Sequence, residues 1–273
     1  MLPLRLNCLL RTSTMAKYKN IQIAGGDTSA PLNLAKRLKL MAPYIKKGSD
    51  RLLDCGSGGG EYVYALHSTF NIDSYGVEYA FTKIKQALPD SLADNRVLCG
   101  DIESLPFDDE TFDVVLINEV LEHVPSETAS LSEIYRVLKK DGKLVIFSPN
   151  RLYPFETHGV QMMRSLRMLP IYTPFIPYIP LNIGNKFLNY VARNYWPKEL
   201  ESIVRQNGFN VIHHDYVWQT FENISGSQPV LIKRLNTLLR AIANTLEKAI
   251  FLRCFGLSQM VVATKDKTAS RDK

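Results

Sequence analysis

The sequence has few of the residues that form disulfide frameworks or metal centres. Its 273 residues include only four cysteines and five histidines. The histidines form no HExxH motif, and the adjacent pair His213 and His214 would point to opposite faces of a strand. The cysteines form no CxxC pair and are scattered at Cys8, Cys55, Cys99 and Cys254. These absences indicate free thiols in a reducing compartment and predict that the protein holds no metal.

Long apolar runs without a helix breaker are also absent. The longest uncharged stretch, residues 168–185, contains four prolines, so we do not expect it to form a membrane-spanning helix. Hydrophobic residues make up 45% of the chain, which is enough for the core of one large domain or two small ones. The formal net charge of +6 is mild, so it permits an anionic partner and requires none.

Acidic residues are missing from the first twenty positions, which contain four basic residues and several hydroxyls. This composition is compatible with a mitochondrial presequence, with a disordered start, or with initiation at Met15. We expect residues 1–30 to be an extension outside the fold and residues 31–273 to form a single domain. The expected location is cytoplasmic, with a mitochondrial, membrane-peripheral protein as the alternative.

From residue 50 onward, short apolar runs alternate with segments of helical spacing. The runs lie at residues 51–56, 74–79, 96–102, 112–120 and 142–150. The helical segments between them lie at residues 61–70, 81–92 and 126–142, the last ending at Gly142. Strands that are apolar on both faces and alternate with helices indicate an α/β fold with a parallel, doubly wound sheet.

Beyond Asn150 this alternation breaks. Residues 151–196 are rich in proline and aromatic residues. A helix at 197–209, a strand at 210–218, a long amphipathic helix at 229–255 and a strand at 258–265 are predicted to follow. The domain therefore has two expected insertions, at about 151–196 and 219–256.

The stretch "LLDCGSGGGEY" joins the first predicted strand to the first helix. Gly56, Gly58 and Gly60 form a G-x-G-x-G turn, which lets the backbone take positive φ and lets a ligand approach it closely. A dinucleotide-binding turn has the spacing G-x-G-x-x-G, so an NAD enzyme is a distant alternative. Asp54 directly precedes the turn, and a carboxylate there favours a cationic ligand over a phosphate.

Two further acids end the next two strands. Glu78 in "GVEYA" follows Asp54 by 24 residues, about the spacing at which a carboxylate binds ribose hydroxyls. Asp101 in "GDIESLPF" ends the third strand. Three successive strands therefore end in a carboxylate at one edge of the sheet, where ligands bind in open α/β folds.

These motifs, together with "FDVVLINEVLEHV" and "YRVLKKDGKLVIFSPN", resemble the class I S-adenosylmethionine-dependent methyltransferases, in particular the ubiquinone and menaquinone methyltransferase group. The resemblance covers about residues 50–150. It implies a Rossmann-like sheet of seven strands in the order 3-2-1-4-5-7-6, with strand 7 antiparallel and formed by residues 258–265.

The resemblance also implies a role for each matching residue. Asp54 and the glycine turn would hold the methionine part of S-adenosylmethionine, and Glu78 would bind both ribose hydroxyls. The residues near the adenine would be Tyr79, Asp101 and Ile102. Asn118 and Glu119 would lie near the sulfonium and the entrance for the acceptor.

The absence of two motifs reduces the range of possible methyl acceptors. No [DNS]-P-P-[YF] follows the fourth strand, and no Pro-Cys occurs there, which disfavours amino-group methylation and a covalent cytosine mechanism. We expect transfer to a hydroxyl or carbon of a small, lipophilic or aromatic acceptor. If a general base assists, the candidates are His123, Glu156 and His158. His123 follows Glu119 by four residues, so the two are expected to share a helix face.

Other readings stay open. An RNA (tRNA) methyltransferase is compatible with the charge, but no RNA-binding module is recognisable, which disfavours nucleic acid. A non-catalytic, cofactor-binding regulatory protein is the third class. Residues 151–196 are expected to form a lid over the acceptor. Residues 229–253 form an apolar stripe with basic neighbours, which would suit core packing, an anionic membrane or a second subunit.

Overall fold

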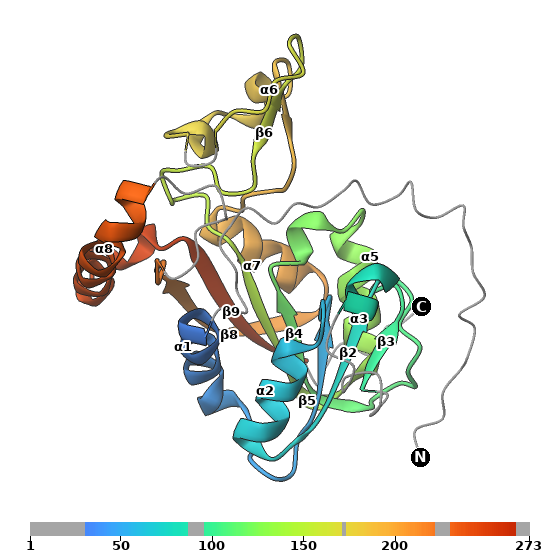
Figure 1. Ribbon diagram of the computed structural model, residues 1–273. Coiled ribbons are helices and arrows are strands. Elements are labelled where there is room, and N and C mark those ends of the chain that lie inside the picture. Colours follow the sequence, from blue (N-terminus) through green and yellow to red (C-terminus); the bar gives the residue numbers. More distant parts are fainter. Residues whose placement is uncertain (1–30, 87–95, 171–172, 222–229, 266–273) are drawn as a thin grey trace.

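A computed structural model describes residues 31–86, 96–170, 173–221 and 230–265. A seven-stranded sheet lies between two layers of helices, and a smaller lobe projects from it (Figure 1). The predicted extension at residues 1–30 lies outside the described residues.

The sheet has the predicted topology. Its strands are β1 (Arg51–Cys55), β2 (Asp73–Glu78), β3 (Val97–Cys99), β4 (Phe112–Asn118), β5 (Leu138–Pro149), β8 (Phe209–Val217) and β9 (Ser258–Lys265). They are ordered β3-β2-β1-β4-β5-β9-β8. The neighbouring strands from β3 to β5 pair in parallel, and β9 is antiparallel to both β5 and β8. Counted within this sheet alone, the order is 3-2-1-4-5-7-6, which confirms the prediction.

Most of the predicted helices are also present. The α-helices around the sheet are α1 (Pro31–Met41), α2 (Glu61–Phe70), α3 (Phe81–Gln86), α5 (Glu127–Val137), α7 (Pro197–Gln206) and α8 (Val230–Lys248). Three-residue 3₁₀ helices are η1 (Ala42–Tyr44), η2 (Leu121–His123), η3 (Ile176–Tyr178) and η4 (Arg253–Phe255). The helix predicted at 81–92 is seen as far as Gln86, and its remainder lies outside the described residues.

The strands bury both faces, as the alternation of side chains requires. One core contains Leu53, Val115 and Ile146 from the strands and packs against α5 and α7. The other contains Leu52, Val114 and Phe147 and packs against α1 and α2. Neighbouring residues of one strand thus belong to opposite cores, and the carboxyl ends of β1, β2 and β4 are held side by side between them.

The helix predicted at residues 126–142 is shorter than expected. It begins as predicted, because the Ser126 hydroxyl accepts a hydrogen bond from the Ala129 amide at 3.1 Å. It ends at Val137, because the fully buried Leu138 is already the first residue of β5 and pairs with Phe112 in β4. Asp141 then takes a φ of +63°, and the register between β4 and β5 shifts between Leu138 and Lys143, so an irregular part of β5 occupies the segment that was predicted to be helical.

The lobe consists of residues that follow β5. It contains β6 (Val160–Met162), η3, α6 (Leu181–Gly184) and β7 (Leu188–Tyr190), with β6 and β7 forming a two-stranded sheet. Arg151 holds it together, because its buried guanidinium donates to the Pro177 carbonyl at 2.6 Å and the Ile179 carbonyl at 2.8 Å. Among the described residues, the longest helix, α8, is too polar to cross a bilayer, and the others are shorter still.

Candidate active site

The glycine turn lies where β1 ends and α2 begins. Gly56, Gly58 and Gly60 have φ values of +79°, +56° and +92°, which side chains with a Cβ rarely adopt. The Gly56 and Ser57 amides both donate to the Val77 carbonyl, at 2.7 and 3.0 Å, and this ties the turn to β2. A Cβ at Gly58 would meet only the Glu61 carboxylate at 3.8 Å, so the turn has room for a ligand at this position.

Asp54 is a buried carboxylate with an unused acceptor. It is 2% exposed, and its Oδ1 atom has no hydrogen-bond partner among the described residues. Burial raises its pKa to about 8, and the charges of Glu78 and Glu61 add to the rise. A buried carboxylate between two other acids is suited to a cationic group, because such a ligand would supply the missing charge partner. This fits the amino group and sulfonium of S-adenosylmethionine.

Glu78 is oriented by the backbone around it. Its carboxylate accepts from the Gly58 amide at 2.9 Å and from the Ala80 amide at 2.8 Å, one bond to each oxygen. A carboxylate oxygen has two lone pairs, so each oxygen can still accept a hydroxyl. The arrangement therefore fits a pair of ribose hydroxyls, as the resemblance implies.

The residues expected near the adenine lie at the ends of β2 and β3. Tyr79 follows β2, and its carbonyl accepts from the Cys99 thiol at 3.8 Å. Asp101 turns the chain after β3 by accepting from the Glu103 amide at 2.9 Å. Ile102 is 6% exposed and packs in the core on the α5 side of the sheet. The structure thus brings Asp54, Glu78 and Asp101 to one edge.

Asn118 and Glu119 end β4 and are bound to a residue that the sequence analysis missed. Arg37, in α1, donates to the Asn118 amide oxygen and, at 2.8 Å, to the Glu119 carboxylate. Its guanidinium also lies 4.7 Å from the centre of the Phe147 ring. Burial opposes ionisation of Glu119, but the charge of Arg37 and hydrogen bonds from Ser258 and Arg37 outweigh it and lower the pKa of Glu119. Glu119 is therefore a charged, buried anchor for α1, β4 and β9.

The expectation that Glu119 and His123 share a helix face is wrong. Glu119 has a φ of +54°, which interrupts the chain after β4, and only Leu121–His123 form a short 3₁₀ helix. The left-handed residue is held in place because the Glu119 amide donates to the Phe147 carbonyl at 2.9 Å. A spacing of four residues therefore does not bring these two side chains onto one helical face here.

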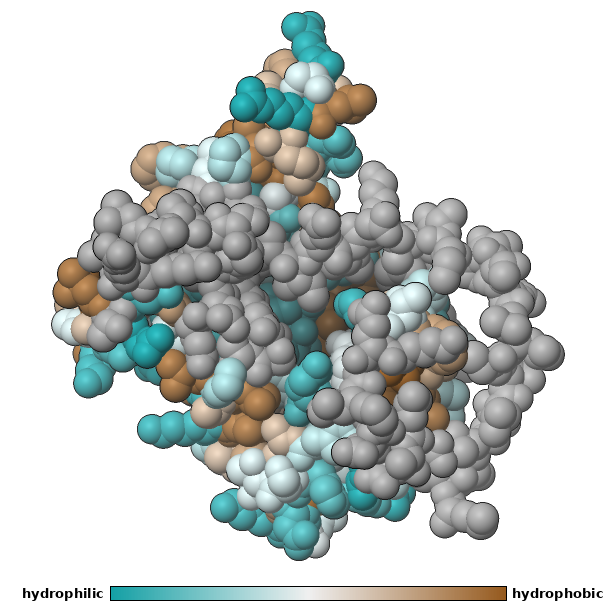
Figure 2. All heavy atoms as spheres, in the orientation of Figure 1, coloured by the Kyte–Doolittle hydropathy of each residue, from teal (hydrophilic) through white to brown (hydrophobic). Residues whose placement is uncertain are grey.

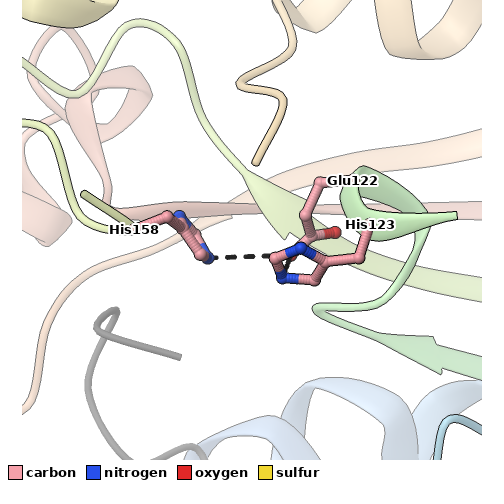
Figure 3. Close-up of side chains that lie close together, drawn as sticks. All are labelled: Glu122, His123 and His158. Carbon is pink, nitrogen blue, oxygen red and sulfur yellow. Dashed lines mark ion pairs between the residues drawn. The ribbon is translucent and has the colours of Figure 1, made fainter. Parts of the chain in front are cut away.

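Two of the three candidate bases lie together. The rings of His123 and His158 are 5.5 Å apart, centre to centre, and Glu122 Oε1 lies 3.9 Å from the Nε2 atom of each (Figure 3). Burial, followed by the charge of His158, lowers the pKa of His123 to about 4. Burial also lowers the pKa of His158. Both imidazoles are therefore neutral at pH 7.

The Glu156 carboxylate accepts hydrogen bonds from its own loop and from Asn194. Its Oε1 atom accepts from the Thr157 amide at 3.0 Å and the His158 amide at 2.9 Å, and its Oε2 atom accepts from the Asn194 side chain at 3.2 Å. Burial raises the pKa of Glu156 against these hydrogen bonds, which favour the charged form. In this arrangement Glu156 shapes the loop that carries His158.

Comparisons with known proteins agree with this site. Residues 53–146 match the family described as Methyltransferase domain. The demethylmenaquinone methyltransferase of Lactobacillus johnsonii is 31% identical over 186 residues, which cover 64% of this chain and 75% of that protein.

Two further comparisons match either a shorter part of the chain or its fold. MJ0638, an uncharacterized protein of Methanocaldococcus jannaschii, is 36% identical over 115 residues, 41% of this chain, and the chain spans only 46% of its length. The crystal structure of an S-adenosylmethionine-dependent methyltransferase from Archaeoglobus fulgidus superposes with a TM-score of 0.51 at 22% identity, covering 86% of this chain and 93% of that one. This last likeness shows the fold.

Proposed function

Because this chain belongs to the class I S-adenosylmethionine-dependent methyltransferases, we propose that it transfers the methyl group to a hydroxyl or carbon of a small, lipophilic acceptor. The observation that carries the cofactor site is Asp54, a buried carboxylate without a partner beside a turn of three left-handed glycines. In this proposal Asp54 and the turn hold the methionine part, and Glu78 holds the ribose.

The cofactor supplies an activated methyl group, so the work left to the protein is orientation and exclusion of water. Asn118 and Glu119 would border the place of transfer, and Arg37 fixes both of their side chains. His158, which is buried, and His123, which is partly buried, lie next to each other on the loop after β5 and on η2. Because Arg37 fixes the side chains of Asn118 and Glu119, an acceptor that contacts them would be held in one orientation.

Two observations support a lipophilic acceptor. The relative from Lactobacillus johnsonii is named for demethylmenaquinone, a compound of lipid character. The lobe after β5 also carries large apolar side chains in contact with solvent, and Figure 2 shows apolar surface on it. Its most exposed members are Leu166, Phe175 and Phe187, at 70%, 65% and 60%. We infer that this lobe acts as the lid over the acceptor.

We further propose that the lobe and the end of α8 rest on an anionic membrane surface. Ile250 and Phe251, just after α8, are 84% and 89% exposed. The Asn150 side chain donates to the carbonyls of Cys254 at 2.7 Å and Gly256 at 2.8 Å, which fixes η4 to the start of the lobe. Basic residues lie close in sequence to these apolar groups, at Arg164, Arg167, Lys186 and Lys248. The stripe predicted for the first turns of α8 lies outside the described side chains.

Membrane binding is tested by sedimentation with vesicles of phosphatidylglycerol or of phosphatidylcholine. We expect binding to the anionic vesicles that falls with salt, and a loss of at least tenfold in the double variant Ile250→Glu, Phe251→Glu. Ile212→Glu is the matched control, because Ile212 is 47% exposed on β8 and lies outside this surface. Equal binding to both vesicles, or a dimer that the double variant converts to a monomer, would contradict the membrane proposal.

The acceptor is tested with S-adenosylmethionine labelled in the methyl group. The protein is incubated with a demethylated quinol in vesicles, with a soluble phenol and with transfer RNA. We expect label in the quinol and none in the RNA. Label in the RNA alone, with a salt-sensitive gel shift, would replace this proposal by the RNA reading.

A further inference from the structure

Three side chains that could bind a metal ion converge beside the proposed transfer site. Glu122 and His123 come from η2, and His158 comes from the loop after β5 (Figure 3). The Nε2 atoms of His123 and His158 each lie 3.9 Å from Glu122 Oε1. One ligand atom from each residue lies within 4.8 Å of the other two. They meet although His158 is 35 positions from His123.

The polar atoms at the centre of this cluster have no partners. Both carboxylate oxygens of Glu122 and the Nε2 atoms of His123 and His158 are buried and make no hydrogen bond to any residue that the structure describes. Glu122 and His158 are 3% and 4% exposed. Most buried polar groups in proteins are hydrogen-bonded, so four unsatisfied atoms that face one another require an explanation. The separations of 3.9 Å are too long for hydrogen bonds within the cluster.

The main chain and the outer atoms of the cluster are anchored. The His123 amide donates to the Val120 carbonyl at 2.9 Å, and the His158 amide donates to Glu156 at 2.9 Å. His158 Nδ1 lies 3.1 Å from the Thr157 hydroxyl, which engages that nitrogen and leaves Nε2 for the centre. Such outer hydrogen bonds are what orient the histidine ligands of metal sites.

The charges around the cluster leave one carboxylate unbalanced. Glu119 is paired with Arg37, whereas, within the part of the chain that the structure describes, only His123 and His158 come within ion-pair distance of Glu122. Arg193 and Lys83 also act on His123, but Arg193 is paired with Glu127. A divalent cation would accept a lone pair from the Glu122 carboxylate and one from each imidazole.

We propose that Glu122, His123 and His158 bind a divalent cation such as zinc. Two imidazoles and one carboxylate are the ligand set of catalytic zinc sites, which keep a fourth position open. Ligand atoms in a tetrahedral zinc site lie about 3.3 Å apart, so these three would close by about 1 Å or less on average. This proposal departs from the sequence-based expectation of no metal, which rested on the absence of local motifs. The role of the cation rests on the proposed function: in the open position it would hold the oxygen of the acceptor.

The test uses tag-free protein that has been treated with a chelator and then titrated with zinc chloride. We expect one zinc per chain by elemental analysis and calorimetry, and an affinity at least 100-fold weaker in Glu122→Gln and in His158→Gln. His214→Gln is the matched control, because His214 lies on β8 and is bound to Glu201 and Gln259 instead. Substitution with cobalt would give visible absorption typical of nitrogen and oxygen ligands, without the thiolate band that cysteine ligands produce.

Binding of S-adenosylhomocysteine by each variant shows whether it has folded. It also separates this proposal from the proposed function, because zinc binding by a protein that transfers no methyl group would leave the metal site intact. No bound zinc, or zinc bound equally by the parent and by both variants that still bind S-adenosylhomocysteine, would overturn the proposal. The two unpartnered oxygens of Glu122 would then be explained by a proton shared with Glu119.

Discussion

The raised pKa of Asp54 predicts that binding of the cofactor depends on pH. In the free protein this carboxyl has a pKa of about 8, so it is mostly neutral at pH 7. A cationic ligand would favour the charged form, and binding below pH 8 would therefore release a proton. Each pH unit below the free pKa costs about 1.4 kcal/mol, so the affinity should rise about tenfold per unit up to about pH 8 and then level off.

Calorimetry with S-adenosylhomocysteine between pH 6 and 9 measures this dependence. Titrations at pH 7 in two buffers with different heats of ionisation count the proton that is released. The amino group of the ligand titrates as well, so Asp54→Asn is the control, because it removes the carboxyl and keeps the ligand's own titration. An affinity with the same pH profile in Asp54→Asn and in the parent protein would refute the reasoning, and so would uptake of a proton on binding.

Three further predictions concern stability and the cofactor site. Glu78→Ala removes the acceptor of two backbone hydrogen bonds and of the proposed ribose contact. The free energy of binding S-adenosylhomocysteine should therefore weaken by about 1.5–3 kcal/mol or more. Unchanged binding by calorimetry would argue against the site. Arg37→Met leaves Glu119 buried without its cation, so the free energy of unfolding measured in urea should fall by about 3–5 kcal/mol. A fall of less than about 1 kcal/mol would show that Glu119 does not depend on Arg37 for its charge balance. Gly56→Ala forces a Cβ into the Val120 side chain at positive φ and should cost about 1–3 kcal/mol, whereas Gly48→Ala, also at positive φ but in open space, should cost less in the same thermal scans.

The sheet could be predicted because its signals are local. Runs such as "FDVVLIN" are apolar on both faces, and the glycine turn and the acids at the strand ends follow directly in the sequence. The strand order came from the resemblance, since alternation alone does not fix which strands are neighbours. The structure confirms both, including the antiparallel position of β9.

The centre of the candidate site could not be predicted in the same way. Arg37 reads as one of several basic residues on an amphipathic helix, and only the packing of α1 on β4 and β5 makes it a buried partner of Glu119. Glu122 and His158 are brought close together by the course of the loop after β5. The spacing of residues in the sequence does not predict the course of such a loop. The end of α5 was missed because the pairing of Leu138 with Phe112 is a tertiary effect that overrides helical propensity.

The central claim, that the acidic edge of the sheet binds S-adenosylmethionine, is tested most directly by isothermal titration of the purified protein. S-adenosylmethionine, S-adenosylhomocysteine and NAD are compared at pH 8, where protonation of Asp54 opposes binding less than it does at pH 7. We expect the first two to bind in the micromolar range with one site per chain, and NAD not to bind. Binding of NAD, or of none of the three, would contradict the account and bring forward the reading of a non-catalytic protein.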